Sequence, residues 1–455
     1  VMTTKLTPDE NIQSAMQIAL SMASDKGASG ADVIGNRSES ISFKAAGGKL
    51  DEYTISQDQV LGIRVIKHSK VGLAYSESLD PKALEYMVQT AVQNAEFAKA
   101  DETEQIAVNT SENIEVIDPD LNQQEDLVID SQIEFALSLE SEVLKADSRV
   151  RSAPINELSM SQSDLYIANS AGRTCFHTEK THYCLTSALM SEDGQNALHY
   201  HGMIGRKFSD LKVDHVVKQS IYHAAHFLKA KPISSGKYSV VFIPEVLHSL
   251  FGNFRSTFSA KSAIEKMNPW GEKRGDLVMD KRLSVTDDPT DKKGLAYTLF
   301  DSEGHRTSKL NLVENGVLKN FYHNTATANY YKTTSTGHAA RGPKSSLGVS
   351  GTNIKIALGP NTDASVKDGK YLHIVAIQGL GSGSDVMSGD FSFAASGYLM
   401  NGDKIEQVVK EVTISGNYYD ILINNIELVG DKEYATFNKY FFSPLIRFRD
   451  LTVSS

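Results

Sequence analysis

Long stretches of alternating polar and apolar residues constrain the fold of this chain most. Residues 158–168 and 174–190 keep a period of two for longer than most strands do, which predicts a sheet of long strands. Further alternating stretches lie at 40–45, 51–56, 59–66, 71–76 and 197–203. Segments with helical spacing lie between them, at 12–23, 84–95, 127–144 and 214–228. The pattern predicts an α+β protein whose N-terminal half mixes helices and strands.

The helix starts carry recognisable signals. Thr7-Pro8-Asp9-Glu10 predicts a capped helix start, and Gly27 predicts its end. Asp80-Pro81 opens the next helix in the same way. These signals indicate that both helices are surface helices with one buried face.

Residues 231–236, KPISSG, provide the clearest domain boundary, because proline and glycine end one pattern before a strand begins. We therefore expect an N-terminal α+β domain over 1–230 and a C-terminal domain over 231–455. The polar, acidic segment 101–126 marks a second boundary inside the first domain. Beyond 231 only residues 245–265 look helical over a long stretch, and turn signals separate short strands, so we expect a β-rich, mainly antiparallel domain.

Composition and charge exclude several classes of protein. A chain of 455 residues buries a large core without disulfides, and two cysteines favour a reducing compartment. The polar start, VMTTKLTPDENIQSAMQ, and the lack of 18 consecutive apolar residues predict neither export nor a membrane span. We expect a cytoplasmic protein. A formal charge of −10 without basic clusters argues against direct nucleic-acid binding.

Residues 239–251, SVVFIPEVLHSLF, resemble a metalloprotease helix that has lost its metal ligands. A zinc helix of the HExxxH type presents two histidines to one ion and a glutamate to its water. Here Pro244 and Ser249 occupy the histidine positions, and Glu245 alone stays in register. His248 stands one position early, which turns it about 100° around a helix. Taken alone, the segment also fits an ordinary helix start with proline at its first position.

Several sequence blocks together resemble the TldD/PmbA family, from about residue 12 to residue 453. The blocks are RVI at 64–66, VGLA at 71–74, ANSAG at 168–172, DP at 288–289, FDSEG at 300–304, ENGVLK at 314–319, STGHAAR at 335–341, GDFSFAASG at 389–397 and TISGN at 413–417. The last block is typical of the PmbA branch, also called TldE. Members of the family are described as cytosolic metallopeptidase subunits, and in older usage as modulators of DNA gyrase.

The resemblance implies a division of labour between two subunits. In the family the TldD-type subunit carries HExxxH and a late cysteine ligand, whereas the PmbA-type subunit lacks them and pairs with it. No cysteine follows Cys184 in this chain. The resemblance therefore implies no zinc here, zinc in a TldD-type partner, and unfolded peptides as the substrate. A non-enzymatic binding or regulatory homodimer acting on a protein or peptide client is the alternative.

A second candidate metal site is the pattern C-x-H-x4-H-x-C at Cys175, His177, His182 and Cys184. The two pairs would supply four soft ligands if they met across a hairpin. A strand with one polar and one apolar face explains the same spacing.

Three further features have both a functional and a structural interpretation. Asp301, Glu303 and His305 would place three possible metal ligands on one side of a strand, but they also suit a structural turn. Arg341 is the charged residue best suited to hold a peptide carboxylate, or else a structural ion pair. Trp270, in a loop after the expected helix, would line a peptide groove.

Overall fold

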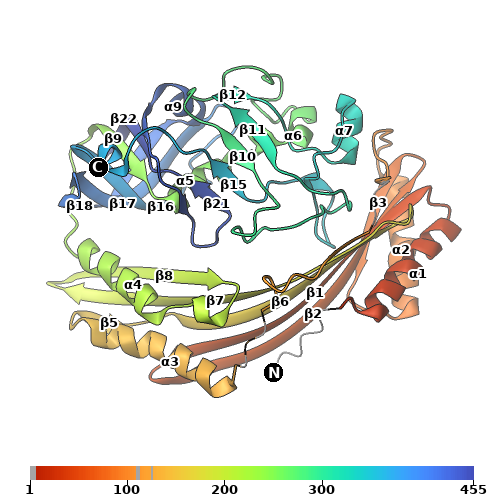
Figure 1. The fold of residues 1–455 in the computed structure, drawn as a ribbon, viewed down its shortest axis with the longest axis horizontal. Coiled ribbons are helices and arrows are strands. Elements are labelled where there is room, and N and C mark those ends of the chain that lie inside the picture. The colour runs from red at the N-terminus through yellow and green to blue at the C-terminus, as the bar shows by residue number, and fades with distance from the viewer. Residues whose placement is uncertain (1–6, 109–112, 124, 126) are drawn as a thin grey trace. The chain divides into compact units, whose positions relative to one another are not determined.

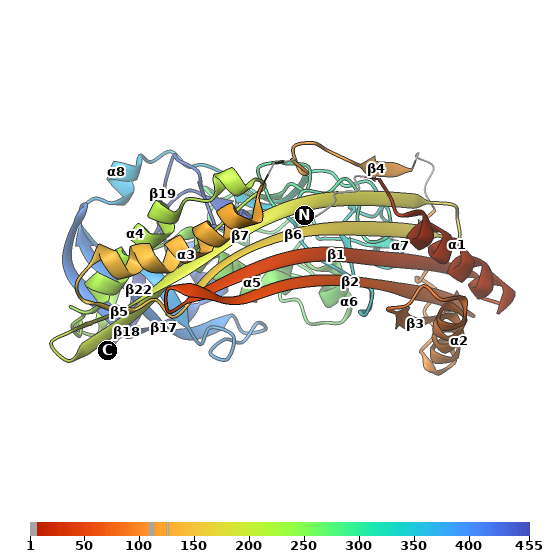
Figure 2. The ribbon, with the colours of Figure 1, turned by 90° about the horizontal axis from the view of Figure 1, so that it is seen from below.

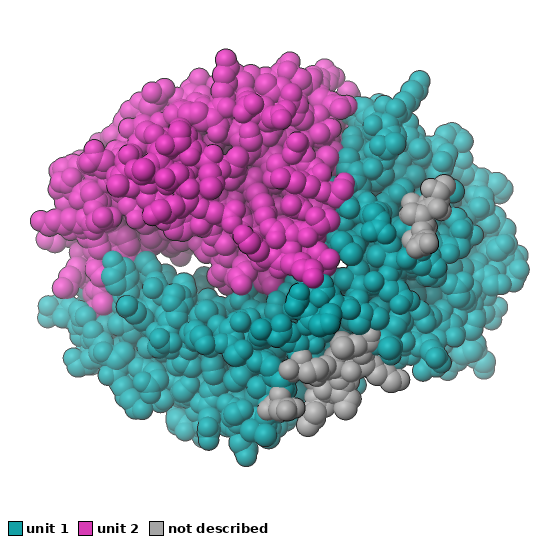
Figure 3. All heavy atoms as spheres, in the orientation of Figure 1, with its two compact units in different colours: residues 1–224, 298–307, 323–350 teal, residues 225–297, 308–322, 351–455 magenta. Residues whose placement is uncertain are grey.

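The computed structural model describes residues 7–108, 113–123, 125 and 127–455. The chain divides into two compact units (Figure 3). Unit 1 comprises residues 1–224, 298–307 and 323–350, and unit 2 comprises 225–297, 308–322 and 351–455. Two later segments, 298–307 and 323–350, therefore fold with unit 1 in addition to its N-terminal stretch. Part of the predicted 101–126 boundary segment lies outside the described residues.

A large, almost entirely antiparallel sheet forms the body of unit 1, in the order β3-β2-β1-β6-β7-β4, with β5 and β8 also paired to β7. Its strands are β1 (Gly30–Ala46), β2 (Lys49–Lys67), β3 (Lys70–Ser76), β4 (Ile114–Val116), β5 (Val150–Ser152), β6 (Asn156–Asn169), β7 (Thr174–Glu192) and β8 (Gln195–Gly205). Figure 2 shows β1, β2, β6 and β7 running side by side as long curved strands. The segments predicted at 51–56 and 59–66 form one strand, because β1 pairs along all of β2 up to Ile66.

Two pairs of helices cover this sheet (Figure 1). Near one end lie α1 (Glu10–Asp25) and α2 (Pro81–Phe97), and near the other α3 (Ile129–Ala146) and α4 (Val213–Phe227). Ile12, Met16, Leu84 and Val88 pack with strand residues in the first core, and Ala136, Leu139, Phe43 and Leu158 pack in the second. Asp9 caps α1 by accepting from the N–H of Asn11, so the helix begins after Asp9 and not after Thr7.

Short elements complete unit 1. They are η1 (Phe208–Asp210), α7 (Thr325–Tyr331), β13 (Ala339–Ala340) and β14 (Gly348–Val349). The last three belong to the inserted segment 323–350.

A sheet that closes on itself forms the centre of unit 2. Its order is β18-β17-β16-β9-β22, and β22 pairs back to β18 and also to β19. The strands are β9 (Gly236–Phe242), β16 (Lys370–Gln378), β17 (Asp390–Asn401), β18 (Lys404–Asn417), β19 (Ile426–Val429) and β22 (Ile446–Ser454). All its pairings are antiparallel except β9 with β16. The prediction of an α+β protein with antiparallel sheets is confirmed.

A second sheet of unit 2 has the order β12-β11-β10-β15-β21-β20. Its strands are β10 (Val285–Asp287), β11 (Leu310–Glu314), β12 (Val317–Leu318), β15 (Ile354–Ile356), β20 (Tyr434–Ala435) and β21 (Phe441–Ser443). The helical elements are α5 (Pro244–Asn253), η2 (Arg255–Phe258), α6 (Ala260–Ile264), α8 (Asp363–Val366) and α9 (Tyr418–Asn424). Across the described parts of the chain, no helix is both long and apolar enough to cross a bilayer.

Candidate functional site

The degenerate zinc motif lies on α5, directly after β9. Ile243 is in extended conformation and Pro244 takes the first helical position, where its missing N–H costs no hydrogen bond. The helix buries Val246, Leu247, Leu250 and Phe251. The other side of α5 therefore carries the residues of the motif.

Each motif side chain that bears a polar group already makes a contact within unit 2. Glu245 Oε1 accepts a hydrogen bond from the N–H of Phe437 at 3.0 Å, and burial raises the pKa of Glu245. Ser249 Oγ donates to the carbonyl of Glu245 at 2.8 Å. The His248 ring lies 5.2 Å from the Phe441 ring at an interplanar angle of 22°, and burial lowers the pKa of His248.

These residues do not fit the zinc that the family motif holds. Pro244 has no side-chain donor atom, and the Ser249 hydroxyl is bonded to its own helix. His248 stands one residue before the position of the second zinc ligand, and its ring is stacked on the ring of Phe441. Over the described residues, no group of three or more His, Cys, Asp or Glu side chains is arranged to hold a metal ion. No metal-dependent step follows from α5.

The Cys/His cluster does not form the predicted hairpin. Cys175, His177, His182 and Cys184 all lie on the single strand β7. Because side chains alternate along a strand, the first two point to one face and the last two to the other. At ~3.3 Å per residue, the two cysteines are roughly 30 Å apart. All four residues are buried in unit 1. Phe176 and Thr178 are buried too, so β7 is covered on both faces at Cys175–Thr178 and does not have one polar and one apolar face there.

Asp301, Glu303 and His305 form a turn in unit 1, not a strand. Asp301 Oδ1 accepts from the backbone N–H groups of Glu303 and His305, at 2.9 and 3.0 Å. Its Oδ2 accepts from the N–H of Ala339 at 3.0 Å. Burial, with the negative charge of Glu303, raises the pKa of Asp301. The carboxyl group therefore holds together the two segments of the C-terminal half that fold with unit 1.

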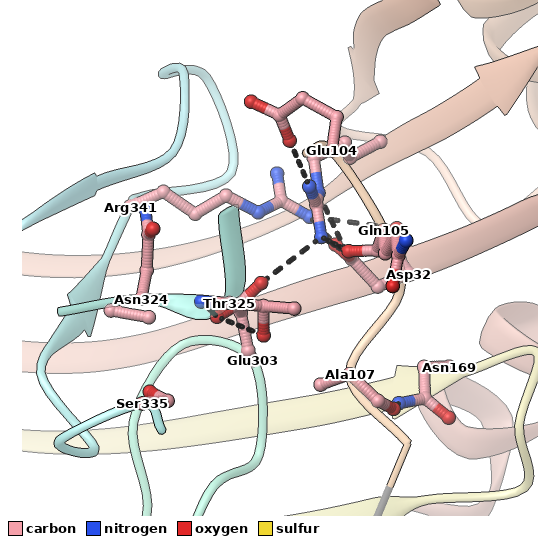
Figure 4. Close-up of polar contacts among 12 residues, drawn as sticks. Asp32, Glu104, Gln105, Ala107, Asn169, Glu303, Asn324, Thr325, Ser335 and Arg341 are labelled. Carbon is pink, nitrogen blue, oxygen red and sulfur yellow. Dashed lines mark hydrogen bonds and ion pairs between the residues drawn. The ribbon is translucent and has the colours of Figure 1, made fainter. Parts of the chain in front are cut away.

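Arg341 belongs to a buried ionic cluster within unit 1 (Figure 4). Its Nη2 lies 2.6 Å from Asp32 Oδ1, and the opposite oxygen of Asp32 accepts from Arg64 Nε at 2.7 Å. Arg64 also contacts Glu104 at 3.0 Å and Glu303 at 3.4 Å. Burial alone would raise the pKa of Asp32, but the charges of Arg64 and Arg341 hold it below its usual value. The structure supports the ion-pair interpretation of Arg341.

Glu303 links this cluster to α7. Its Oε2 accepts from the Thr325 N–H at 2.8 Å and from the Thr325 hydroxyl at 2.9 Å (Figure 4). Arg341 and Glu303 are the two members of this cluster that the sequence singles out as functional candidates. The signal for Asp32 and Arg64 is a charged residue inside an apolar strand, in ADVIG and GIRVI.

Trp270 does not line a groove in this conformation. The residue is 1% exposed and belongs to the core of unit 2. Its ring packs against Phe258 at 5.5 Å and Tyr419 at 5.8 Å. A loop position after a helix gave no indication that the ring would turn inward.

Comparison with known proteins covers most of the chain. Sequence models of the PmbA/TldA metallopeptidase domain 1, central domain and C-terminal domain match residues 31–95, 122–225 and 235–455. Metalloprotease PmbA of Escherichia coli O157:H7 is 27% identical over 93% of this chain and 92% of its own length. A Metalloprotease TldD homolog of Buchnera aphidicola is 24% identical over 84% of this chain and 81% of its own.

Solved structures share the fold. TldE from Thermococcus kodakarensis matches with a TM-score of 0.80 at 18% identity, covering 97% of this chain and 100% of that one. A proposed modulator of a DNA gyrase from Thermotoga maritima matches with a TM-score of 0.83 at 24% identity, covering 97% and 100%. At these identities the structures establish the fold alone. With all three domain models matched in order, the chain belongs to the PmbA/TldD metallopeptidase family.

Proposed function

We propose that this chain is the PmbA/TldE-type subunit of a TldD/PmbA metallopeptidase complex and is not catalytic alone. One observation carries the proposal. The helix α5 keeps the glutamate of the motif in register, but Pro244, Ser249 and His248 present no set of ligands to an ion. A glutamate without a metal-bound water has nothing to activate.

In this proposal a TldD-type partner supplies HExxxH, the late cysteine and the zinc. The present chain contributes to the enclosure around the partner's site and restricts which polypeptides enter it. Substrates are unfolded peptides in the cytosol, since extended backbone is free to be bound as a strand. Glu245 then has a structural role, because its carboxylate joins α5 to Phe437.

The test is co-purification of the chain with a TldD-type subunit, followed by separation of the subunits and elemental analysis of each. We expect zinc to stay with the partner and the isolated chain to hold far less than one zinc per molecule. Unstructured peptides should be cleaved by the complex in a chelator-sensitive manner and left intact by the chain alone. One tightly held zinc per molecule of this chain would overturn the proposal. A stable homodimer with no affinity for a TldD-type subunit would favour the non-enzymatic alternative.

A further inference from the structure

The outer part of β2 has a hydrogen-bonded neighbour on one side only. β1 pairs with β2 from Lys49 onward, whereas β3 pairs only with Leu61–Lys67. Within the described chain, residues 49–60 pair with no strand other than β1. Figure 2 shows β2 at the margin of the sheet. About half of the backbone N–H and C=O groups of this stretch therefore point away from the sheet.

This open edge has only part of the usual protection against strand addition. Natural edges are guarded by charged side chains, above all lysine, by proline, by bulges or by a covering helix, and of these residues 49–60 have charged side chains, three of them acidic. Residues 49–60, KLDEYTISQDQV, contain no proline and a single lysine at the start. The one irregularity in the pairing with β1 lies at Lys44/Ala45, near the hairpin, so the edge is regular from Glu52 to Val60.

An apolar row runs from the core of unit 1 onto this edge and ends exposed. Ile41 and Phe43 are buried in the core beneath α3. Their partners across the β1–β2 ladder are Ile55 and Tyr53, which are 60% and 43% exposed. The Tyr53 ring lies 5.1 Å from the Phe43 ring, so the row is continuous. One more strand on β2 would cover both exposed side chains.

The charge of the edge indicates what such a strand should carry. Residues 49–60 hold one lysine against Asp51, Glu52 and Asp58, a formal charge of −2. Glu52 and Asp58 alternate with Tyr53 and Ile55, so they project from the opposite face of the strand. Lys44 of β1 already pairs with Glu52 at 2.8 Å, so Asp58 is the acidic side chain that a basic ligand residue would meet on this face. Pairing with a second copy would place one acidic edge against another, which opposes self-association.

We propose that residues 49–60 of β2 bind an extended, basic peptide by strand addition. The ligand has apolar side chains at alternate positions, which cover Tyr53 and Ile55, and lysine or arginine between them, one of which faces Asp58. Backbone hydrogen bonds supply affinity that is independent of sequence. The alternation of apolar and basic side chains determines which face of the peptide lies on the side of Tyr53 and Ile55. The site lies on the sheet of unit 1, whereas α5 belongs to unit 2.

The choice of a peptide as occupant rests on the proposed function, but the binding itself needs neither zinc nor a partner. A failure of peptide binding by the isolated chain would leave the subunit assignment standing. Conversely, zinc bound by this chain itself would overturn the subunit assignment but would leave the peptide-binding proposal unaffected.

The probe is a fluorescent, capped octapeptide of alternating valine and lysine, titrated into the isolated full chain and followed by anisotropy. An alternating valine–glutamate peptide and a valine–lysine peptide with its valines in one block serve as controls, and we expect both to bind at least about tenfold more weakly. Two further peptides carry N-methyl groups on every second amide, one on the odd-numbered residues and the other on the even-numbered residues. Only one of them should fail to bind, because the N–H groups on only one edge of the peptide face β2.

The matched variants are Ile55→Lys on the edge and Ile18→Lys on α1, where Ile18 is 40% exposed. Ile55→Lys should raise the Kd about tenfold or more, since covering an isoleucine side chain contributes enough free energy for that ratio. Ile18→Lys should leave it unchanged, and equal melting temperatures establish that both variants fold. No binding of the alternating peptide, or binding insensitive to Ile55→Lys and to both methylation patterns, would overturn the proposal. So would a dimer that Ile55→Lys dissociates and that binds no peptide.

Discussion

The side chain of Arg64 is 1% exposed and contacts three carboxylates, those of Asp32, Glu104 and Glu303. Two of these carboxylates are also buried. Removing the Arg64 cation takes from Glu303 the guanidinium that it contacts and leaves Asp32 with Arg341 alone, in a medium of low dielectric constant. The cluster therefore makes unit 1 sensitive to a single substitution.

We predict that Arg64→Ala lowers the free energy of unfolding by about 3–5 kcal/mol. The control is Arg37→Ala, because Arg37 also pairs with two carboxylates, Asp9 and Glu39, but its side chain is 30% exposed. That change should cost about 1 kcal/mol or less. Urea denaturation of both variants measures the difference. Equal losses would contradict the view that burial makes the Arg64 cluster structurally important.

At the scale of elements, the packing of α2 on β3 depends on Gly72. A Cβ atom at this position would lie 1.8 Å from the carbonyl oxygen of Ala91 in α2, so the helix backbone itself would have to move. We predict that Gly72→Ala lowers the melting temperature by several degrees. Gly252→Ala in α5 is the control, since an added Cβ meets nothing within 4 Å and alanine favours a helix. A neutral Gly72→Ala would show that α2 shifts at little cost.

The packing of α4 on β8 should depend on pH. His199 lies 4.6 Å from His223, and His201 lies 5.4 Å from His215, measured between ring centroids. Burial, with the neighbouring His201, lowers the pKa of His199 to about 4, and burial with His215 lowers that of His201 to about 4. The unfolded chain thus binds more protons between pH 6.5 and pH 4, and the stabilisation present above pH 6.5 is lost as pH falls through this window.

Hydrogen exchange of α4 measures this effect. We expect exchange, corrected for its intrinsic pH dependence, to accelerate as the pH is lowered from 6.5 to 4. The double variant His199→Gln/His201→Gln should reduce that acceleration, whereas His68→Gln, at an exposed turn between β2 and β3, should not. The same acceleration in wild type and double variant would exclude these two histidines as its cause.

For the whole molecule, periodicity in the sequence predicted the elements well and their grouping less well. The alternating stretches became β6, β7 and β8 within a few residues. The local sequence pattern does not reveal that residues 298–307 and 323–350 fold with unit 1. Three contacts hold these segments there: Asp301 with Ala339, Glu303 with Arg64, and Arg341 with Asp32. Long-range charge pairs of this kind are set by tertiary contacts.

The degenerate motif was visible in the sequence, but the contacts of its side chains were not. The sequence alone shows that Pro244 replaces the first histidine of the motif and that His248 stands one position before the second. The bond from Phe437 to Glu245 joins residues 192 positions apart, and no spacing rule predicts it. This bond gives Glu245 a structural contact within unit 2.

The most direct test of the proposed division of labour is Glu245→Gln, measured in the complex with a TldD-type subunit. A glutamine keeps an oxygen that accepts from the Phe437 N–H, so fold and assembly should be preserved. We predict chelator-sensitive peptide cleavage at the wild-type rate, whereas the same substitution in the partner's HExxxH should abolish it. Loss of turnover by Glu245→Gln, with normal assembly and melting temperature, would make Glu245 a catalytic base and contradict the account.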